Sequence, residues 1–190
     1  MNISLIGFMG TGKSSVGQEL AQNLDYKFVD LDEEIVKEDG RPIPDIFAED
    51  GEDYFRDVET KVTEKIGSRD NQVIATGGGV ILRDQNIANL KQNGIVILLQ
   101  ATPEEIYNRT KDDDNRPLLE VEDPLAKINS LLEERKESYQ CTPYQIDTTE
   151  LSIEEVVKKI EEIVAGSEFR EKWCIWIAKL NKAKSREIGA

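Results

Sequence analysis

The segment 7–14, GFMGTGKS, constrains the fold of this chain more than any other part of the sequence. It follows a short apolar run, NISLI (2–6), and precedes a stretch with helical spacing of apolar residues. The segment matches the pattern G-x-x-x-x-G-K-[ST], in which glycines let successive backbone N–H groups turn toward an anion and the helix N-terminus adds positive potential. The sequence therefore predicts a strand–loop–helix unit that binds the phosphates of a nucleoside triphosphate.

Two side chains of this loop have specific expected roles. Lys13 would reach the β- and γ-phosphates of ATP, and the Ser14 hydroxyl would ligate Mg²⁺, the expected cofactor. The other candidate phosphate-binding residues lie in the same loop and the first helical turn: Gly10, Thr11, Gly12 and Ser15.

The order of apolar segments predicts the fold class. Five short, mostly continuous apolar runs suit strands that are covered on both faces, as in a parallel sheet: 2–6, 27–31, 72–76, 94–99 and, more weakly, 144–147. Amphipathic helical patterns alternate with them, at 15–24, 54–66, 103–110, 123–139 and 152–164. This alternation predicts a doubly wound α/β three-layer sandwich with a central parallel five-stranded sheet, whose ligands bind beyond the carboxyl ends of the strands.

Composition excludes several classes of function. The chain has no histidine, which rules out a Ser–His–Asp triad or a His-based zinc site, and its two cysteines are too few for a disulfide framework. The net charge of −14 argues against nucleic acid as a partner. No run of apolar residues is long enough to span a membrane and no signal peptide is recognisable, so a reducing cytoplasm is the expected location.

Acidic residues follow the second predicted strand in VDLDEEI. Asp30 and Asp32 are expected to project toward the ligand, where one could order water molecules on Mg²⁺ and the other could accept a proton from a substrate hydroxyl. An alternative interpretation is that Asp32 caps a helix whose first turn contains Glu33 and Glu34. The two interpretations are compatible.

Three further features carry possible chemistry. Arg56 lies on a helical pattern beside Phe55, where a surface position is the simpler interpretation. The triple glycine 77–79 follows a predicted buried strand, and a small rigid ligand pressed against bare backbone would explain it. The charged segment KDDDNRPLLEVED (111–123) is either a solvated loop or a lid that brings Arg116 over the ligand.

These motifs together resemble the shikimate kinase family. GFMGTGKS, DLD (30–32), FR (55–56), GGG (77–79), RPLL (116–119) and ERKESY (134–139) occur in the order and approximate spacing of that family. The resemblance covers residues 1–165. It implies a P-loop kinase fold of the adenylate kinase type with a lid at about 111–123, and ATP-dependent phosphorylation of the 3-hydroxyl of shikimate in chorismate biosynthesis.

The resemblance also implies roles for individual residues. Asp32 would bind the reacting hydroxyl and serve as the base, and the backbone of Gly77, Gly78 and Gly79 would pack against the shikimate ring. Arg56 and Arg135 would clamp the shikimate carboxylate, since guanidinium groups match its planar geometry. On the nucleotide side, Arg116 would close over the transferred phosphate. Arg109 would stack on adenine, although a helix-surface position is an equal alternative.

The extension at 166–190 differs from the preceding domain (1–165). It contains six basic and three acidic residues, and both tryptophans of the chain. It is interpreted as cloning-derived sequence, since GSEF is a common product of adjacent cloning sites. A packed terminal helix, or a basic amphipathic helix that binds a partner or a surface, are the alternatives.

Two other functions are compatible with the sequence. A gluconate kinase of the same fold would share the phosphate loop but would read hydroxyl groups instead of a carboxylate. A non-catalytic ATP-binding module would retain the loop without substrate-dependent release of ADP. The family resemblance implies a monomer whose partners are the small molecules ATP and shikimate.

Overall fold

The computed structural model describes residues 1–111, 119, 121–167, 169, 171, 173–175 and 177–178. Its centre is a five-stranded sheet with the order β2-β3-β1-β4-β5, in which every neighbouring pair is parallel. The strands are β1 (Asn2–Ile6), β2 (Lys27–Asp30), β3 (Gln72–Ala75), β4 (Gly94–Gln100) and β5 (Gln145–Asp147). All five lie where the apolar runs predicted strands.

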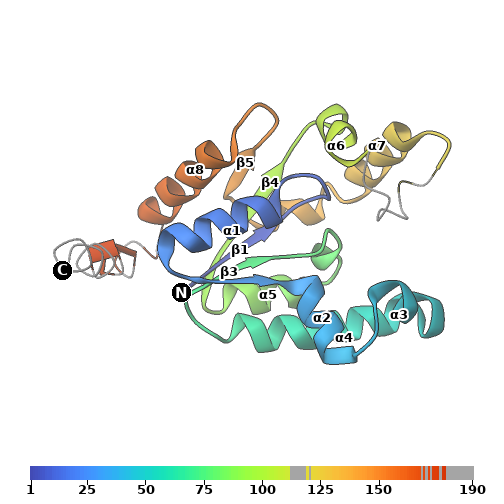
Figure 1. Cartoon of the computed structure of the whole chain (residues 1–190), viewed down its shortest axis with the longest axis horizontal. Coiled ribbons are helices and arrows are strands. Elements are labelled where there is room, and N and C mark those ends of the chain that lie inside the picture. Colours follow the sequence, from blue (N-terminus) through green and yellow to red (C-terminus); the bar gives the residue numbers. More distant parts are fainter. Residues whose placement is uncertain are drawn as a thin grey trace.

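Helices cover both faces of this sheet (Figure 1). They are α1 (Lys13–Leu24), α2 (Leu31–Asp39), α3 (Ile43–Glu49), α4 (Gly51–Gly67), α5 (Asp84–Lys91), α6 (Pro103–Thr110), α7 (Pro124–Glu134) and α8 (Ile153–Gly166), with short 3₁₀ helices η1 (Val80–Leu82) and η3 (Ser138–Cys141). The predicted α/β three-layer sandwich with a parallel five-stranded sheet is therefore confirmed.

Local chemistry fixes several of the helix starts. Thr102 accepts a hydrogen bond from the backbone N–H of Glu105, and Pro103 occupies the first turn of α6. Ser152 and Glu155 form a reciprocal capping box at the start of α8. Each cap satisfies backbone N–H groups that have no partner within the helix.

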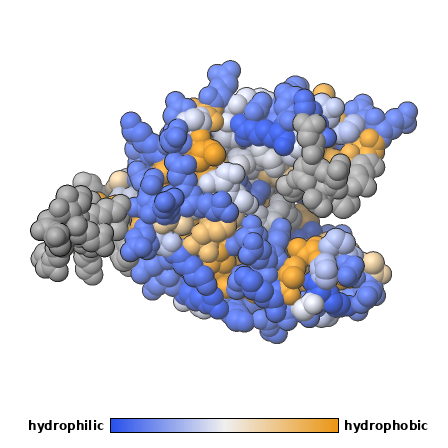
Figure 2. All heavy atoms as spheres, viewed as in Figure 1, coloured by the Kyte–Doolittle hydropathy of each residue, from blue (hydrophilic) through white to orange (hydrophobic). Residues whose placement is uncertain are grey.

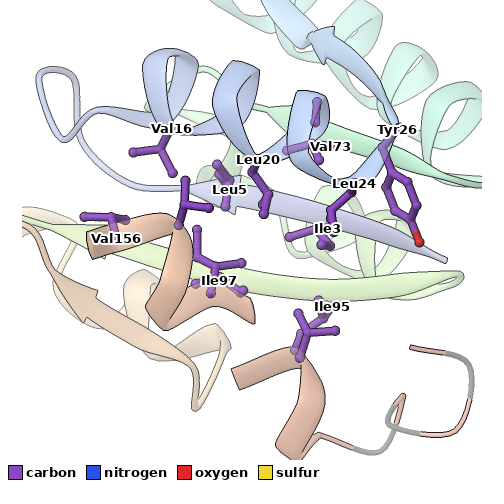
Figure 3. Packing of buried hydrophobic residues seen from close by; sticks show 14 of the residues in the cluster. Ile3, Leu5, Val16, Leu20, Leu24, Tyr26, Val73, Ile95, Ile97 and Val156 are labelled. Atoms are coloured by element: carbon purple, nitrogen blue, oxygen red, sulfur yellow. The ribbon is translucent and has the colours of Figure 1, made fainter. Parts of the chain in front are cut away.

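Two hydrophobic clusters lie on opposite sides of the sheet. On one side, α1 and α8 pack against β1 and β4, and Figure 3 shows Leu20 of α1 and Val156 of α8 directed toward Leu5 and Ile97. On the other side, residues of α2, α4 and α5 pack against the same strands. Strands covered on both faces are apolar along their whole length, which explains the continuous apolar runs.

The exterior has the opposite character. Hydrophilic side chains cover most of the face that Figure 2 shows, and hydrophobic residues appear there in small separate patches. Within the described residues, no helix has the length and apolarity needed to cross a membrane.

One predicted helix is shorter than expected. The pattern 123–139 predicted a single helix, but α7 ends at Glu134, and the chain then forms the separate 3₁₀ helix η3. Arg135, which was expected within the helix, is its C-cap residue. Tyr139 lies in η3, and its backbone N–H donates to the carbonyl of Arg135 at 3.1 Å.

The C-terminal extension contacts the first hydrophobic cluster. The Trp173 side chain is buried there, and Phe169 and Ile177 pack against the cluster at partly buried positions. The backbone N–H of Trp173 donates to the carbonyl of Phe169 at 2.9 Å, as in a helical turn. Of the three interpretations of this segment, the packed terminal helix agrees with these contacts; the origin of the segment stays a prediction.

Candidate active site

The loop after β1 has the backbone shape that the glycine pattern predicted. Gly10 and Gly12 have φ angles of 75° and 92°, a region that side-chain-bearing residues rarely adopt, and Gly12 is the N-cap of α1. The Thr11 hydroxyl donates to the carbonyl of Phe8 at 2.8 Å and fixes the turn. The N-terminus of α1 therefore opens directly onto this loop, an arrangement suited to bind phosphate groups.

The Lys13 ammonium group lies against the same loop. Its Nζ donates to the carbonyl oxygens of Gly7 and Phe8, both at 2.8 Å, and the residue is 9% exposed. These contacts hold a buried positive charge beside the loop, close to where the phosphates of a nucleotide would lie.

A short polar chain connects the loop to the end of β2. The Ser14 hydroxyl donates to Asp30 Oδ2 at 3.3 Å, and Asp30 Oδ1 accepts the backbone N–H of Asp32 at 3.0 Å. Asp30 is thus the N-cap of α2, whereas Asp32 lies in the first turn. The alternative interpretation of Asp32 as the capping residue is wrong, because Asp30 holds that position.

These three side chains also provide a donor set for a metal ion. Hydroxyl and carboxylate oxygens are the ligands that Mg²⁺ prefers, and this ion is commonly bound through one or two protein groups together with substrate phosphates. Ser14 and Asp30, which are hydrogen-bonded to each other, fit that requirement, and Asp32 follows in the first turn of α2.

The triple glycine after β3 lies at the centre of the predicted substrate site. A Cβ atom placed on Gly77 would lie 2.7 Å from Asp32 Oδ1, and one placed on Gly79 would lie 2.6 Å from Arg56 Nη2. The carbonyl of Gly78 accepts a hydrogen bond from Arg135 Nη1 at 3.3 Å. Each glycine therefore faces a different predicted substrate-binding side chain, and larger residues at Gly77 and Gly79 would displace these groups.

The same glycines connect the substrate site to the phosphate loop. A Cβ atom on Gly78 would lie 3.6 Å from the backbone nitrogen of Met9 and 3.7 Å from the carbonyl oxygen of Gly7. The two predicted half-sites are therefore contiguous, as group transfer between two bound molecules requires.

Arg56 is not a simple surface residue. Its guanidinium donates to Glu52 at 3.0 Å and to Glu59 at 3.0 Å, and it lies 5.0 Å from the centroid of the Phe55 ring. Glu59 is 1% exposed and also accepts from Asn86 at 3.3 Å. Burial raises the pKa of Glu59, while the Arg56 charge acts in the opposite direction. The buried carboxylate of Glu59 thus helps to fix the position of the Arg56 guanidinium.

Arg135 approaches the glycines from the other side. The residue is 8% exposed, and its guanidinium lies 5.7 Å from the centroid of the Phe8 ring. Together, Arg56 and Arg135 bring two positive charges to the Gly78–Gly79 backbone, although this chain is strongly acidic overall.

Arg109 lies on the nucleotide side of the loop. Its guanidinium donates to the carbonyl oxygens of Gly10 at 3.3 Å and Thr148 at 2.7 Å, and to the Thr148 hydroxyl at 3.1 Å. It therefore links α6, the phosphate loop and the turn after β5. Stacking on adenine stays a prediction, but the simple helix-surface alternative does not describe these contacts.

The remaining predicted residues are placed as follows. Ser15 lies exposed in the first turn of α1, next to Ser14. Arg116 and most of the predicted lid at 111–123 lie outside the described residues.

A cavity of about 240 Å³ lies beside this site, not within it. It is bounded by the end of β4 and by residues of the phosphate loop, α6, α7 and η3, including Phe8, Ile106, Leu132 and Tyr139. Of the predicted site residues, its lining includes only Thr11. The cavity is therefore separate from the side chains that are predicted to bind the substrate.

Sequence reasoning missed two residues of the site. Glu59 follows Arg56 by one helical turn, and that spacing could have indicated an ion pair. Thr148 is buried and its hydroxyl donates to the carbonyls of Thr11 at 3.3 Å and Gln100 at 3.0 Å. A threonine in a polar loop gives no sequence signal for such a role.

Comparisons with known proteins agree with this geometry. The family model for shikimate kinase matches residues 9–165. The shikimate kinase of Thermodesulfovibrio yellowstonii is 48% identical over 159 residues, which cover 84% of this chain and 92% of that protein. The shikimate kinase of Caldanaerobacter subterraneus is 45% identical, with coverages of 84% and 93%.

A solved structure shows the same similarity in three dimensions. The shikimate kinase from Acinetobacter baumannii in complex with shikimate superimposes with a TM-score of 0.82 at 41% identity, covering 88% of this chain and 94% of that one. The fold, the ordered motifs and these relatives lead to one assignment. This chain belongs to the shikimate kinase family.

Proposed function

We propose that this protein transfers the γ-phosphoryl group of ATP to the 3-hydroxyl of shikimate, giving shikimate 3-phosphate and ADP. The observation that carries the proposal is the triple glycine, which has Asp32, Arg135 and Arg56 around it and the phosphate loop beside it. Shikimate is a small rigid acid with hydroxyl groups. A site with two guanidinium groups, one carboxylate and bare backbone provides a partner for each part of that molecule.

On the nucleotide side, the roles follow from charge. The backbone N–H groups of residues 10–15 and the Lys13 ammonium bind the phosphate oxygens, and Arg109 contributes to the adenine site. Ser14, directly, and Asp30 and Asp32, through water, would hold a Mg²⁺ ion, which would supply positive charge to neutralise the phosphates. Arg116 would add a further positive charge from the lid.

On the acceptor side, Arg56 and Arg135 bind the carboxylate of shikimate and so orient its ring over Gly77–Gly79. The 3-hydroxyl then lies near Asp32, which accepts its proton as the oxygen attacks phosphorus. Phosphoryl transfer needs little covalent help from the protein, so positioning and charge neutralisation supply most of the rate enhancement.

A substrate panel tests the proposal. A coupled assay of ADP release should give ATP- and Mg²⁺-dependent turnover with shikimate and none with gluconate or nucleoside monophosphates. Replacement of both Arg56 and Arg135 by alanine should abolish shikimate binding but leave ATP binding intact, as measured by calorimetry. Equal turnover with gluconate would contradict the assigned acceptor, and ATP binding without shikimate-dependent ADP release would indicate the non-catalytic alternative.

We further propose that the protein acts as a monomer in the cytoplasm, as the family resemblance implies. Sedimentation at micromolar concentration should give a single species of about the 21.5 kDa chain mass. A stable dimer would contradict this part of the proposal.

A further inference from the structure

Tyr139 ends the ERKESY motif and has no role in the mechanism above. It lies in η3, one turn after Arg135, and its backbone N–H donates to the Arg135 carbonyl at 3.1 Å. The side chain is 6% exposed and borders the cavity next to Phe8. A buried tyrosine needs a partner for its hydroxyl, so the surroundings of this group are informative.

Two buried polar groups lie close together here, but their geometry falls short of a well-formed hydrogen bond. Among the described residues, neither Arg135 Nε nor the Tyr139 hydroxyl has a well-formed hydrogen bond to any partner. Burial raises the pKa of Tyr139 to about 12, and the Arg135 guanidinium is close enough to oppose this effect through its charge and through a hydrogen-bonding contact with the phenol. The phenol is therefore neutral near pH 7 and keeps an oxygen that can accept from the guanidinium.

Arg135 is held less firmly than its counterpart Arg56. Within the described part of the chain, its only hydrogen bond from the side chain is the one from Nη1 to Gly78, at 3.3 Å. Arg56, in contrast, donates to two carboxylates. A guanidinium must have a fixed plane to bind a carboxylate through two parallel hydrogen bonds, so Arg135 needs a further contact.

We propose that Tyr139 is a positioning residue for Arg135: its hydroxyl accepts a hydrogen bond from Nε and fixes the plane in which the guanidinium receives the substrate carboxylate. This leaves the Nη groups for the carboxylate and for Gly78. The neighbouring cavity gives the phenol room for the small adjustment that closes the bond. The inference rests on the proposed function, because it assumes an acceptor with a carboxylate.

Tyr139→Phe tests this, because it removes one oxygen and keeps the ring. The KM for shikimate should rise about 5- to 10-fold, the usual effect of one lost hydrogen bond, while kcat and the KM for ATP stay within about two-fold. The matched control is Tyr26→Phe. Tyr26 is also buried, and its pKa is also raised to about 12, but it lies in the cluster between α1 and β1. This control should have the kinetics of the wild type.

Two measurements separate positioning from a structural role. In an Arg135→Ala background, Tyr139→Phe should have no further effect on the KM for shikimate. With shikimate methyl ester, which lacks the charged carboxylate, Tyr139→Phe should have the same KM as the wild type. Additive effects, an equal rise in the KM for the ester, or an unchanged KM for shikimate would each overturn the inference. A wild-type protein that does not phosphorylate shikimate would instead refute the proposed function.

Discussion

At the scale of single residues, Glu59 combines a buried carboxyl group with an ion pair to Arg56, a predicted substrate-binding residue. Burial raises its pKa, so the folded protein binds a proton at this group more readily than the unfolded chain does. The contribution of Glu59 to stability is therefore greatest at low pH and decreases as the pH rises through the raised pKa. The ion pair with Arg56 opposes this effect of burial and favours the charged carboxylate.

Glu59→Gln should therefore weaken substrate binding without unfolding the protein. We expect the KM for shikimate to rise about 10-fold at pH 7, because a neutral amide holds Arg56 less firmly. The melting temperature should equal or exceed that of the wild type. In the wild type, the KM should also rise as the pH falls toward the raised pKa, and the variant should lack this dependence. Glu133→Gln, in an exposed pair with Lys136, is the control; a wild-type KM in Glu59→Gln would refute the role.

Arg116 gives a second prediction at this scale. If it closes over the transferred phosphate, Arg116→Ala should lower kcat about 10²- to 10⁴-fold, because one positive charge near the transition state is lost. ATP affinity, measured by calorimetry, should fall only modestly. An unchanged kcat would show that Arg116 does not stabilise the transferred phosphate.

Functional side chains could be predicted from sequence where the residue type is uncommon at that place in a strand, loop or helix. Lys13 within glycines, Asp32 after a strand and a triple glycine all depart from simple structural patterns. Asp32, Arg56 and the triple glycine were expected at the same site, and the structure brings them together. The spacing of Glu59 from Arg56 is compatible with an ion pair, but its burial could not be predicted, because burial depends on tertiary packing.

At the scale of secondary-structure elements, the turn after β3 positions three side chains from different segments. Gly79→Ala would place a Cβ atom 2.6 Å from Arg56 Nη2, and the flexible arginine would have to move. The KM for shikimate should rise at least 10-fold with little change in the KM for ATP. Gly166→Ala is the control, since among the described residues, its chain neighbours and own helix backbone aside, no atom lies within 4 Å of its added Cβ. A normal KM in Gly79→Ala would show that Arg56 does not need this position.

The same scale shows why some elements could not be predicted. The strands and the helices of strong apolar periodicity were found, but α3 and α5 were missed, and α2 was expected only as an alternative, with the wrong capping residue. In α5, DQNIANLK has only Ile87 and Leu90 as large apolar residues, and both are buried. The shortness of α3 and the many acids of α2 likewise leave too little periodicity, so their helical form depends on packing and on caps such as Asp30.

At the scale of the whole molecule, the extension after residue 165 closes one end of the first hydrophobic cluster. A chain that ends at residue 165 would expose the apolar surface that Trp173 covers. We expect it to lose about 1–3 kcal/mol of stability, seen as a melting temperature lower by several degrees. The kinetic constants for both substrates should not change, because β1 separates this end from the phosphate loop. An identical melting temperature would show that the contact contributes nothing.

The strand order has a consequence for how such an enzyme can change its acceptor. The sheet places β2 and β3, with Asp32 and the triple glycine, on one flank of the phosphate loop, and β4 and β5, with Arg109 and Thr148, on the other. If the proposed roles are correct, the phosphoryl acceptor and the nucleotide are recognised largely by separate halves of the sheet. Specificity for a new acceptor could therefore arise by changes on the β2–β3 side of the sheet alone. Residue 135 would have to change as well, because it contacts Gly78 from a segment between β4 and β5.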